Sequence, residues 1–140
     1  MRCVPVKTED QQAALMQHRT RDFLVHQQTQ LSNAVRAHLS EFGIVAPKGV
    51  DNVERLLALA DKAPLTVAAH QSIRLLSDHV RDTHARIEAI TTGIKAGAQE
   101  DSVARRLQPI PGVGPITASA LAASFPMCRT SKRHATPRPG

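Results

Sequence analysis

A short segment near the end of the chain has residue types suited to binding phosphate. Residues 109–118 read Pro-Ile-Pro-Gly-Val-Gly-Pro-Ile-Thr-Ala. Gly112 and Gly114 permit positive φ angles and carry no side chain, so backbone N–H groups there can approach a phosphate closely. We expect a helix to begin right after Gly114, with Pro115 in its first turn. The unpaired N–H groups and the positive dipole end of that helix would face the same phosphate.

The residues around this segment fit the helix-hairpin-helix pattern of DNA-binding proteins. A short helix with Val103 and Leu107 on its inner face precedes the glycines, Val113 would point inward, and an alanine-rich helix follows. Such contacts position a protein on a duplex without reading its sequence. The alternative is a tight corner in which the glycines serve only the helix crossing and the arginines form a solvated face. The candidate DNA-binding residues are Pro111, Gly112, Val113, Gly114, Pro115, Thr117, Arg105 and Arg106.

Other residues that could do chemistry give weaker patterns. The seven histidines show no metal-ligand spacing, so we expect them on the surface or in grooves. Asp78 and Asp82 could share a metal, but three nearby arginines favour an ion-paired helix surface. No histidine or lysine base can be placed beside Ser119 or Ser124, so neither is predicted to be a nucleophile. The sequence therefore predicts no catalytic and no metal-binding residue.

Two helices are expected before residue 63. Residues 9–41 contain no Gly or Pro, and we expect one long helix that stops at Gly43. Its apolar positions are Leu24, Leu31, Val35, Leu39 and Phe42. Its polar, mildly basic face carries Arg19, Arg21, His26, Gln27, Gln28, Gln30 and Arg36. A short helix should begin at Asp51, after a loop at residues 47–49, and should bury Val53, Leu56, Leu57 and Ala60. Pro64 is expected in the first turn of the next helix.

The strongest periodic pattern in the chain is a heptad seam. Apolar residues recur in alternating steps of four and three at Ala69, Ile73, Leu76, Val80, Thr83, Ile87, Ile90 and Ile94. The seam fits either an antiparallel hairpin with the first long helix or an intermolecular coiled coil. In the second case the oligomerisation residues are Ile73, Leu76, Val80, Ile87, Ile90 and Ile94. After Gly93 and Gly97, Asp101 or Ser102 can cap a helix that runs to about Leu107.

Composition sets the fold class. The 140 residues include three Phe and neither Trp nor Tyr, so a core must be built from Leu, Ile, Val and Ala, which favours an all-α fold. The formal net charge is +6, but residues 127–140 hold four basic residues and no acid, which leaves +2 for the rest.

Cys3 and Cys128 form no disulfide framework, and no membrane span or signal peptide is visible. We therefore expect a cytoplasmic protein without a membrane partner.

Two parts of the sequence resemble a known family. Residues 110–123, Ile-Pro-Gly-Val-Gly-Pro-Ile-Thr-Ala-Ser-Ala-Leu-Ala-Ala, are similar to the start of the C-terminal transposase domain of the IS-one-ten family of bacterial insertion-sequence transposases. Residues 4–13, 18–25 and 31–42 resemble the family segment that leaves a RuvC-like catalytic domain and enters a coiled coil. The resemblance covers residues 1 to about 125.

The resemblance implies a DNA partner, a structured guide RNA, and Mg²⁺ in full-length members. The family's four metal-binding acids would precede Met1, and its serine nucleophile would follow Phe125. No catalytic residue is therefore carried onto this sequence, and no cofactor is expected in this chain. The resemblance implies that residues 111–114 form the hairpin of the DNA-facing domain and that residues 69–94 serve assembly.

Three regions and three functions are expected. Residues 1–99 form the helical coiled-coil region, residues 100–126 begin the transposase domain, and residues 127–140 form a disordered basic tail. The tail reads Met-Cys-Arg-Thr-Ser-Lys where the family pattern reads otherwise, which a frameshift after Pro126 explains. The leading interpretation is a transposase fragment that is inactive alone. The alternatives are a stand-alone helix-hairpin-helix DNA-binding protein and a helical dimerisation module.

Overall fold

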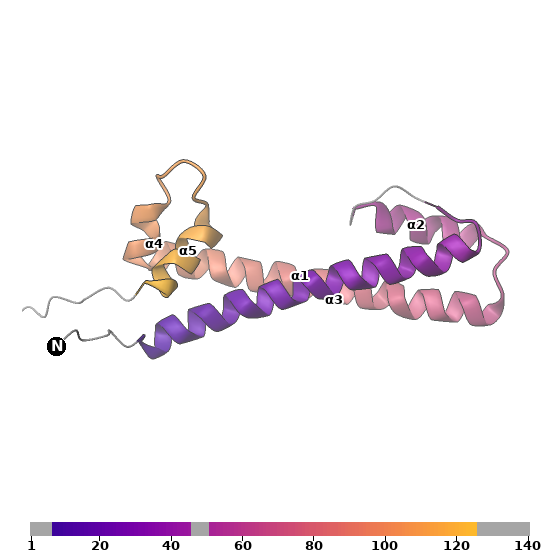
Figure 1. Ribbon diagram of the computed structural model, residues 1–140, viewed down its shortest axis with the longest axis horizontal. Helices are drawn as coiled ribbons and strands as arrows, with labels where there is room; N and C mark the ends of the chain where they lie inside the picture. Colours follow the sequence, from indigo (N-terminus) through magenta and orange to yellow (C-terminus); the bar gives the residue numbers. More distant parts are fainter. Residues whose placement is uncertain (1–6, 46–50, 126–140) are drawn as a thin grey trace, which may run out of the picture.

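The computed structural model describes residues 7–45 and 51–125, which form helices joined by turns and contain no strand (Figure 1). This confirms the all-α prediction. The helices are α1 (Glu9–Glu41), α2 (Asp51–Lys62), α3 (Val67–Glu100), α4 (Ser102–Leu107) and α5 (Pro115–Ser124). The predicted loop at residues 47–49, Cys3, Cys128 and the predicted basic tail at residues 127–140 lie outside the described residues.

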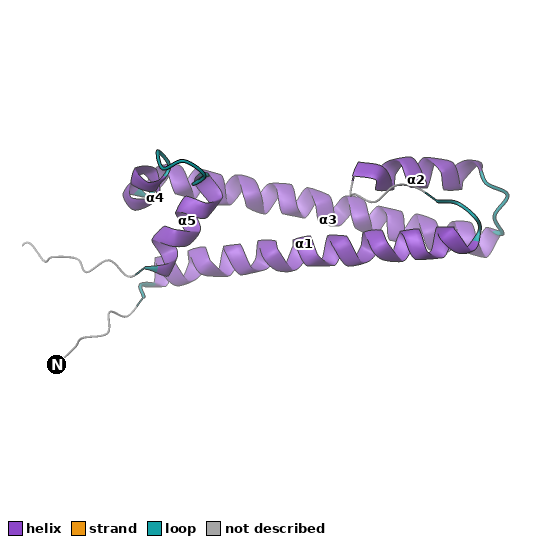
Figure 2. Cartoon of the chain, turned by 45° about the horizontal axis from the view of Figure 1, so that its top comes forward, coloured by secondary structure: helices purple, strands orange, loops and turns teal. Residues whose placement is uncertain are grey.

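An antiparallel pair of long helices forms the axis of the molecule. Helices α1 and α3 have 33 and 34 residues and run side by side in opposite directions, so the molecule is elongated (Figure 2). At 1.5 Å per residue each helix is about 50 Å long. Helix α2 packs at the end where α1 stops, and α4 and α5 pack at the other end, near the start of α1. The molecule therefore has two ends with different partners.

Local sequence fixes where the long helices begin. Thr8 caps α1 in a capping box: its hydroxyl accepts a hydrogen bond from the backbone N–H of Gln11 at 3.2 Å, and the Gln11 side chain accepts one from the Thr8 N–H at 3.1 Å. The hydroxyl of Thr66 caps α3 by accepting from the N–H of Ala69 at 3.3 Å. Pro64 was expected in the first turn of this helix, but it precedes the cap. Thr66 starts the helix because its side chain can satisfy an N–H group, which Pro64 cannot do.

The main core lies at the α2 end. Eight residues with 6% exposure or less form it: Val35, Leu39, Val53, Leu56, Leu57, Ala60, Ile73 and Val80. All four predicted apolar positions of α2 are among them, which confirms that face of the helix. Phe42, by contrast, is 50% exposed. It lies beyond the last residue of α1, where the chain turns at Gly43 with φ of +76°, so the helical periodicity no longer places it on the buried face.

The heptad seam of α3 faces α1 in the same chain. Of the candidate oligomerisation residues, Ile73, Val80, Ile87 and Ile94 are buried, and Leu76 and Ile90 are half-buried. Helices α1 and α3 make the most extensive contact between any two elements. Of the two open interpretations, the structure has the hairpin within one chain. An intermolecular coiled coil through these residues would have to displace α1.

Small polar residues on α1 and α3 are also buried. Ser32, Ser77 and Thr83 are at most 6% exposed, and each hydroxyl donates to the carbonyl four residues earlier on its own helix. Gln28 was expected on the polar outer face of α1 but is 7% exposed. Its amide nitrogen lies 3.1 Å from Nδ1 of His84 on α3. A buried amide is tolerated here because it has a hydrogen-bond partner across the interface.

Candidate nucleic-acid interface

The α4–α5 end is built around alanine. Ala98, Ala104, Ala118 and Ala122 are buried in one cluster, with Val103, Leu107 and Val113 packed against it. Because methyl side chains occupy little space, the helices can approach one another closely. The inner face predicted for α4 and the inward position predicted for Val113 are both confirmed. This cluster fixes the hairpin that joins α4 to α5 against the end of α3.

The hairpin contains a tight turn set by a Pro-Gly pair. The N–H of Val113 donates to the carbonyl of Ile110 at 3.0 Å, which closes a four-residue turn around Pro111 and Gly112. Gly112 has φ of +85°. Pro at the second position and Gly with positive φ at the third are the residues that a type II turn requires. Gly112 is therefore explained by backbone geometry, as the sequence predicted.

Gly114 differs from Gly112 in its geometry. Its φ is −79° and its ψ is 174°, an extended conformation open to any residue, so of the two glycines that permit positive φ only Gly112 uses it. A Cβ atom at either glycine would meet nothing within 4 Å. Gly114 precedes α5 as its N-cap and makes no side-chain cap hydrogen bond, and Pro115 follows at the first turn as predicted. Neither backbone strain nor packing against the described residues requires a glycine at position 114.

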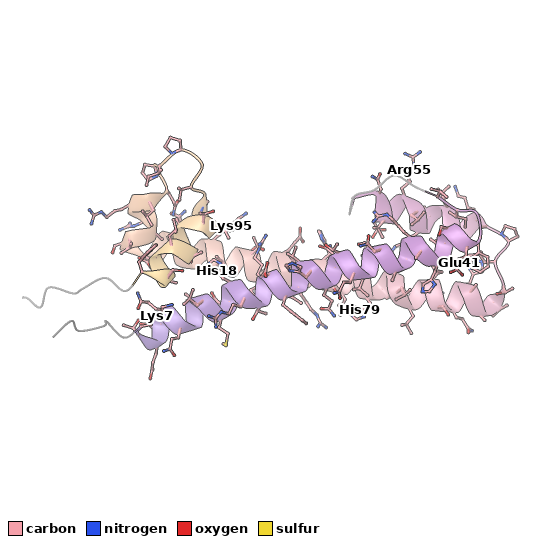
Figure 3. All side chains as sticks on the ribbon, in the orientation of Figure 1. Lys7, His18, Glu41, Arg55, His79 and Lys95 are labelled. Atoms are coloured by element: carbon pink, nitrogen blue, oxygen red, sulfur yellow. The ribbon has the colours of Figure 1, made fainter. Side chains whose placement is uncertain are left out.

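The hairpin and its two helices carry basic residues and no acid, whereas Glu100 and Asp101 lie at the end of α3 and Asp10, at the start of α1, lies beside α5. Arg105 and Arg106 lie exposed on the outer side of α4, and residues 102–125 contain no acid. The carboxylate of Asp101 caps α4, accepting from the N–H groups of Val103 at 2.7 Å and Ala104 at 3.3 Å. Lys95 projects from α3 beside this end (Figure 3). Cations, open backbone and the start of α5 therefore share one end of the molecule.

The structure brings the candidate DNA-binding residues together on the hairpin and its two helices. Pro111, Gly112, Gly114 and Thr117 are exposed, whereas Val113 and Pro115 are half-buried. Thr117 lies in the first turn of α5, close along the chain to Gly114. Five of the eight candidates are consecutive, from Pro111 to Pro115, and the two arginines come from the helix that enters the same hairpin.

A histidine does lie beside Ser119, contrary to expectation. Nε2 of His18 on α1 is 3.2 Å from the hydroxyl oxygen of Ser119 on α5. Burial, and then the positive charge of Arg21, lower the pKa of His18 below its usual value. His18 makes no other hydrogen bond among the described residues, so no carboxylate there orients its ring. The pair joins two helices but lacks the third group of a catalytic triad.

A second contact also ties the hairpin to α1. The side-chain amide of Gln11 donates to the carbonyl of Phe125 at 3.4 Å. The partners in these two contacts are 114 and 101 residues apart. Helical periodicity reports only which face of a helix is apolar, so it could not have paired these residues. No pattern in the sequence predicts either contact.

The acidic residues that could have held a metal are engaged elsewhere. Asp82 pairs with Arg86 at 2.9 Å, and Asp78 lies 3.9 Å from Arg81, which also pairs with Glu54. This confirms the ion-paired surface predicted for α3. Within residues 7–45 and 51–125, no group of three or more His, Cys, Asp or Glu side chains could hold a metal ion. The described residues therefore do not fit the Mg²⁺ that the resemblance implies for full-length members.

A groove of about 350 Å³ between α2 and α3 is the other candidate site. Two acids, Asp61 and Asp78, and two arginines, Arg74 and Arg81, line it together with His70. Because these charges balance, the groove offers no net attraction for an anion. The hairpin with its two helices, where residues 102–125 include Arg105 and Arg106 and no acid, is the better candidate for a phosphate-bearing partner.

Comparison with known proteins finds similarity to transposases. The chain is 41% identical over 133 residues to the transposase y4pF/y4sB of Sinorhizobium fredii, which covers 94% of this chain and 34% of that protein. It is 39% identical over 129 residues to a family 20 transposase of Pseudomonas aeruginosa, covering 89% of this chain and 38% of the relative. The transposase for insertion sequence element IS1328 of Yersinia enterocolitica is 38% identical over 122 residues, 87% of this chain and 36% of the relative.

The similarity extends along most of this chain but not along the relatives. The chain spans about a third of the length of the curated transposases it matches. No family model matches the chain, and no solved structure matches it. In the described part, no helix has both the length and the hydrophobicity needed to cross a membrane.

Proposed function

We propose that this chain is a segment of an insertion-sequence transposase and that its α4–α5 hairpin binds DNA in transposition. The premise is its similarity, at 38–41% identity, to about a third of three proteins named as transposases. The long α1–α3 hairpin would hold the DNA-facing end at a fixed distance from α2. Cutting and joining DNA, and the Mg²⁺ and guide RNA implied by the family resemblance, would belong to the remaining two thirds of such proteins.

Gly114 is the observation that carries the DNA-binding proposal. Its backbone is extended, a Cβ there would meet none of the atoms of residues 7–45 and 51–125 within 4 Å, and no side chain among them caps the helix that follows. A glycine at this position leaves the first N–H groups of α5 open to an external anion. Arg105 and Arg106 supply cations on the preceding helix. A phosphate group of a DNA backbone suits this combination.

The direct test is binding of the full chain to a fluorescent DNA duplex across a salt series. We expect affinity to fall as salt rises from about 50 to 200 mM, because Lys and Arg contacts release counterions. Gly114→Leu should weaken binding at every salt concentration, since its side chain fits without backbone strain but blocks close approach to the N–H groups. Gly93→Leu, at an open position on α3, is the matched control and should bind as the unaltered protein does. Equal binding by all three proteins would remove the hairpin from the proposal.

The proposed inactivity of the chain alone has its own test. Supercoiled plasmid incubated with the purified chain and Mg²⁺ should remain supercoiled. The physical reason is that the described residues provide no metal-binding cluster and that the pair of His18 and Ser119 lacks a carboxylate to orient the histidine. Nicked or joined products that persist in the purified protein would contradict this part of the proposal.

A further inference from the structure

The tip of the α4–α5 hairpin exposes an apolar side chain. Ile110 is 50% exposed, and Pro109 and Pro111 on either side of it are also exposed. Nothing in the alanine cluster that holds Val103, Leu107 and Val113 extends to cover it. An isoleucine in water gains nothing from hydrophobic burial, so its free surface is available to a partner.

This tip is held rigidly. The N–H of Ile110 donates to the carbonyl of Leu107 at 3.1 Å, and the carbonyl of Ile110 accepts from the N–H of Val113 at 3.0 Å. The rings of Pro109 and Pro111 fix their own φ angles. Little conformational entropy remains to be lost when this residue is covered by a partner.

The surroundings of Ile110 select the chemistry of that partner. Arg105 and Arg106 lie on the helix that leads into the tip, and residues 102–125 contain no acid. An acidic surface with apolar patches is therefore favoured over a neutral or basic one. A DNA duplex offers both features side by side, because its charged phosphates border grooves with walls of apolar deoxyribose carbon.

We propose that Ile110 is an apolar DNA contact, packing on the sugar-lined wall of a groove while the backbone around Gly114 and the α4 arginines hold the adjacent phosphates. This inference rests on the proposed function and adds an uncharged contact to it. Proteins that bind the minor groove present apolar side chains, isoleucine among them, to the DNA and insert them between base steps. A contact of this kind releases no counterion, so it contributes equally at low and high salt.

The test compares variants of the full chain on the same fluorescent duplex across the salt series. Ile110→Ser should weaken binding about three- to tenfold, because the exposed half of the isoleucine would no longer be buried against DNA. The slope of log affinity against log salt should stay unchanged. Arg105→Gln should reduce that slope by about 0.9, the value for one phosphate contact. Leu75→Ser, which changes a 70% exposed leucine on α3, is the matched control and should bind unchanged.

The outcomes separate this inference from the function on which it rests. Failure of the unaltered chain to bind the duplex overturns both. Salt-dependent binding that Ile110→Ser leaves unchanged overturns the inference alone, as does a loss of salt slope in that variant, which would mean that the substitution disturbs the charged contacts. If sedimentation without DNA shows an oligomer that only Ile110→Ser dissociates, a second copy covers the tip and the inference is wrong.

Discussion

The two ends of the α1–α3 hairpin are built from different side chains. At the α2 end, Leu39, Leu56 and Val35 are among the largest fully buried residues of the described chain. At the α4–α5 end the buried cluster consists of alanines, Val103, Leu107 and Val113 are only half-buried, and Ile94 is the large apolar side chain that is fully buried beside α5. Large apolar side chains remove more surface from water, so the α2 end contributes more to the free energy of folding.

This difference suggests a division of roles between the ends. The alanine cluster buries little apolar surface, but it lets α4 and α5 approach α3 closely and hold a hairpin whose outer residues remain exposed. The α2 end instead buries four apolar positions of a single short helix. Stability is therefore concentrated at one end and exposed backbone with nearby cations at the other.

The largest expected effect comes from breaking the α2 end. Leu39→Ala removes a side chain with no exposed surface. The free energy of unfolding should fall by about 2–5 kcal/mol, from lost burial and the cavity left behind. Urea unfolding followed by circular dichroism measures it. Leu75→Ala, at a leucine 70% exposed on α3, should change stability by less than about 0.5 kcal/mol. Equal losses in the two variants would contradict the assignment of the core.

A smaller effect should separate the two hairpin glycines. Gly112→Ser forces a side chain into positive φ and should cost about 1–2 kcal/mol of stability. Gly114→Ser needs no strained backbone and can cap α5, so stability should be unchanged or rise by about 0.5 kcal/mol. Thermal unfolding of the two variants makes the comparison. A large loss in Gly114→Ser would mean that folding, rather than a partner, requires glycine there.

The smallest expected effect is a pH dependence at the α4–α5 end. Burial lowers the pKa of His18, so the folded state resists its protonation more than the unfolded state does. The contribution of His18 to stability should be complete above its unfolded pKa of about 6.5 and decline as pH falls through its lower folded value. The stability difference between the unaltered chain and His18→Gln, measured by urea unfolding from about pH 7 to pH 5, should therefore shrink.

The control for this titration is His38→Gln, at an exposed histidine near the other end of α1. It removes one histidine without touching the contact between α1 and α5. A stability difference for His18→Gln that grows as the solution becomes more acidic would have the wrong sign for a buried neutral imidazole.

Much of the fold could be predicted because helix signals are local. Absence of Gly and Pro predicted the span of α1, and the spacing of Val53, Leu56 and Leu57 predicted the buried face of α2. The heptad seam predicted the buried stripe of α3 but not its partner. An apolar stripe indicates that one face of a helix is buried, but the same stripe fits a hairpin within one chain and an intermolecular coiled coil equally well.

The part of the site whose geometry depends on proline and glycine could be predicted. The Pro-Gly pair defined the hairpin and the start of α5, and Val113 was placed inward. The contact between His18 and Ser119 could not be predicted, because it depends on how α5 packs on α1. The exposure of Gln28 and Phe42 was also predicted wrongly. Gln28 is buried by a partner on another helix, and Phe42 follows the end of its own helix.

The central claim is that DNA contacts the α4–α5 end and leaves the α2 end free. Backbone amide chemical shifts of the isotope-labelled full chain, followed while a short DNA duplex is added, test it most directly. The largest changes should fall between Arg105 and Thr117, with little change at Val53 and Leu56. Changes concentrated in α2, or along the groove between α2 and α3, would contradict the claim.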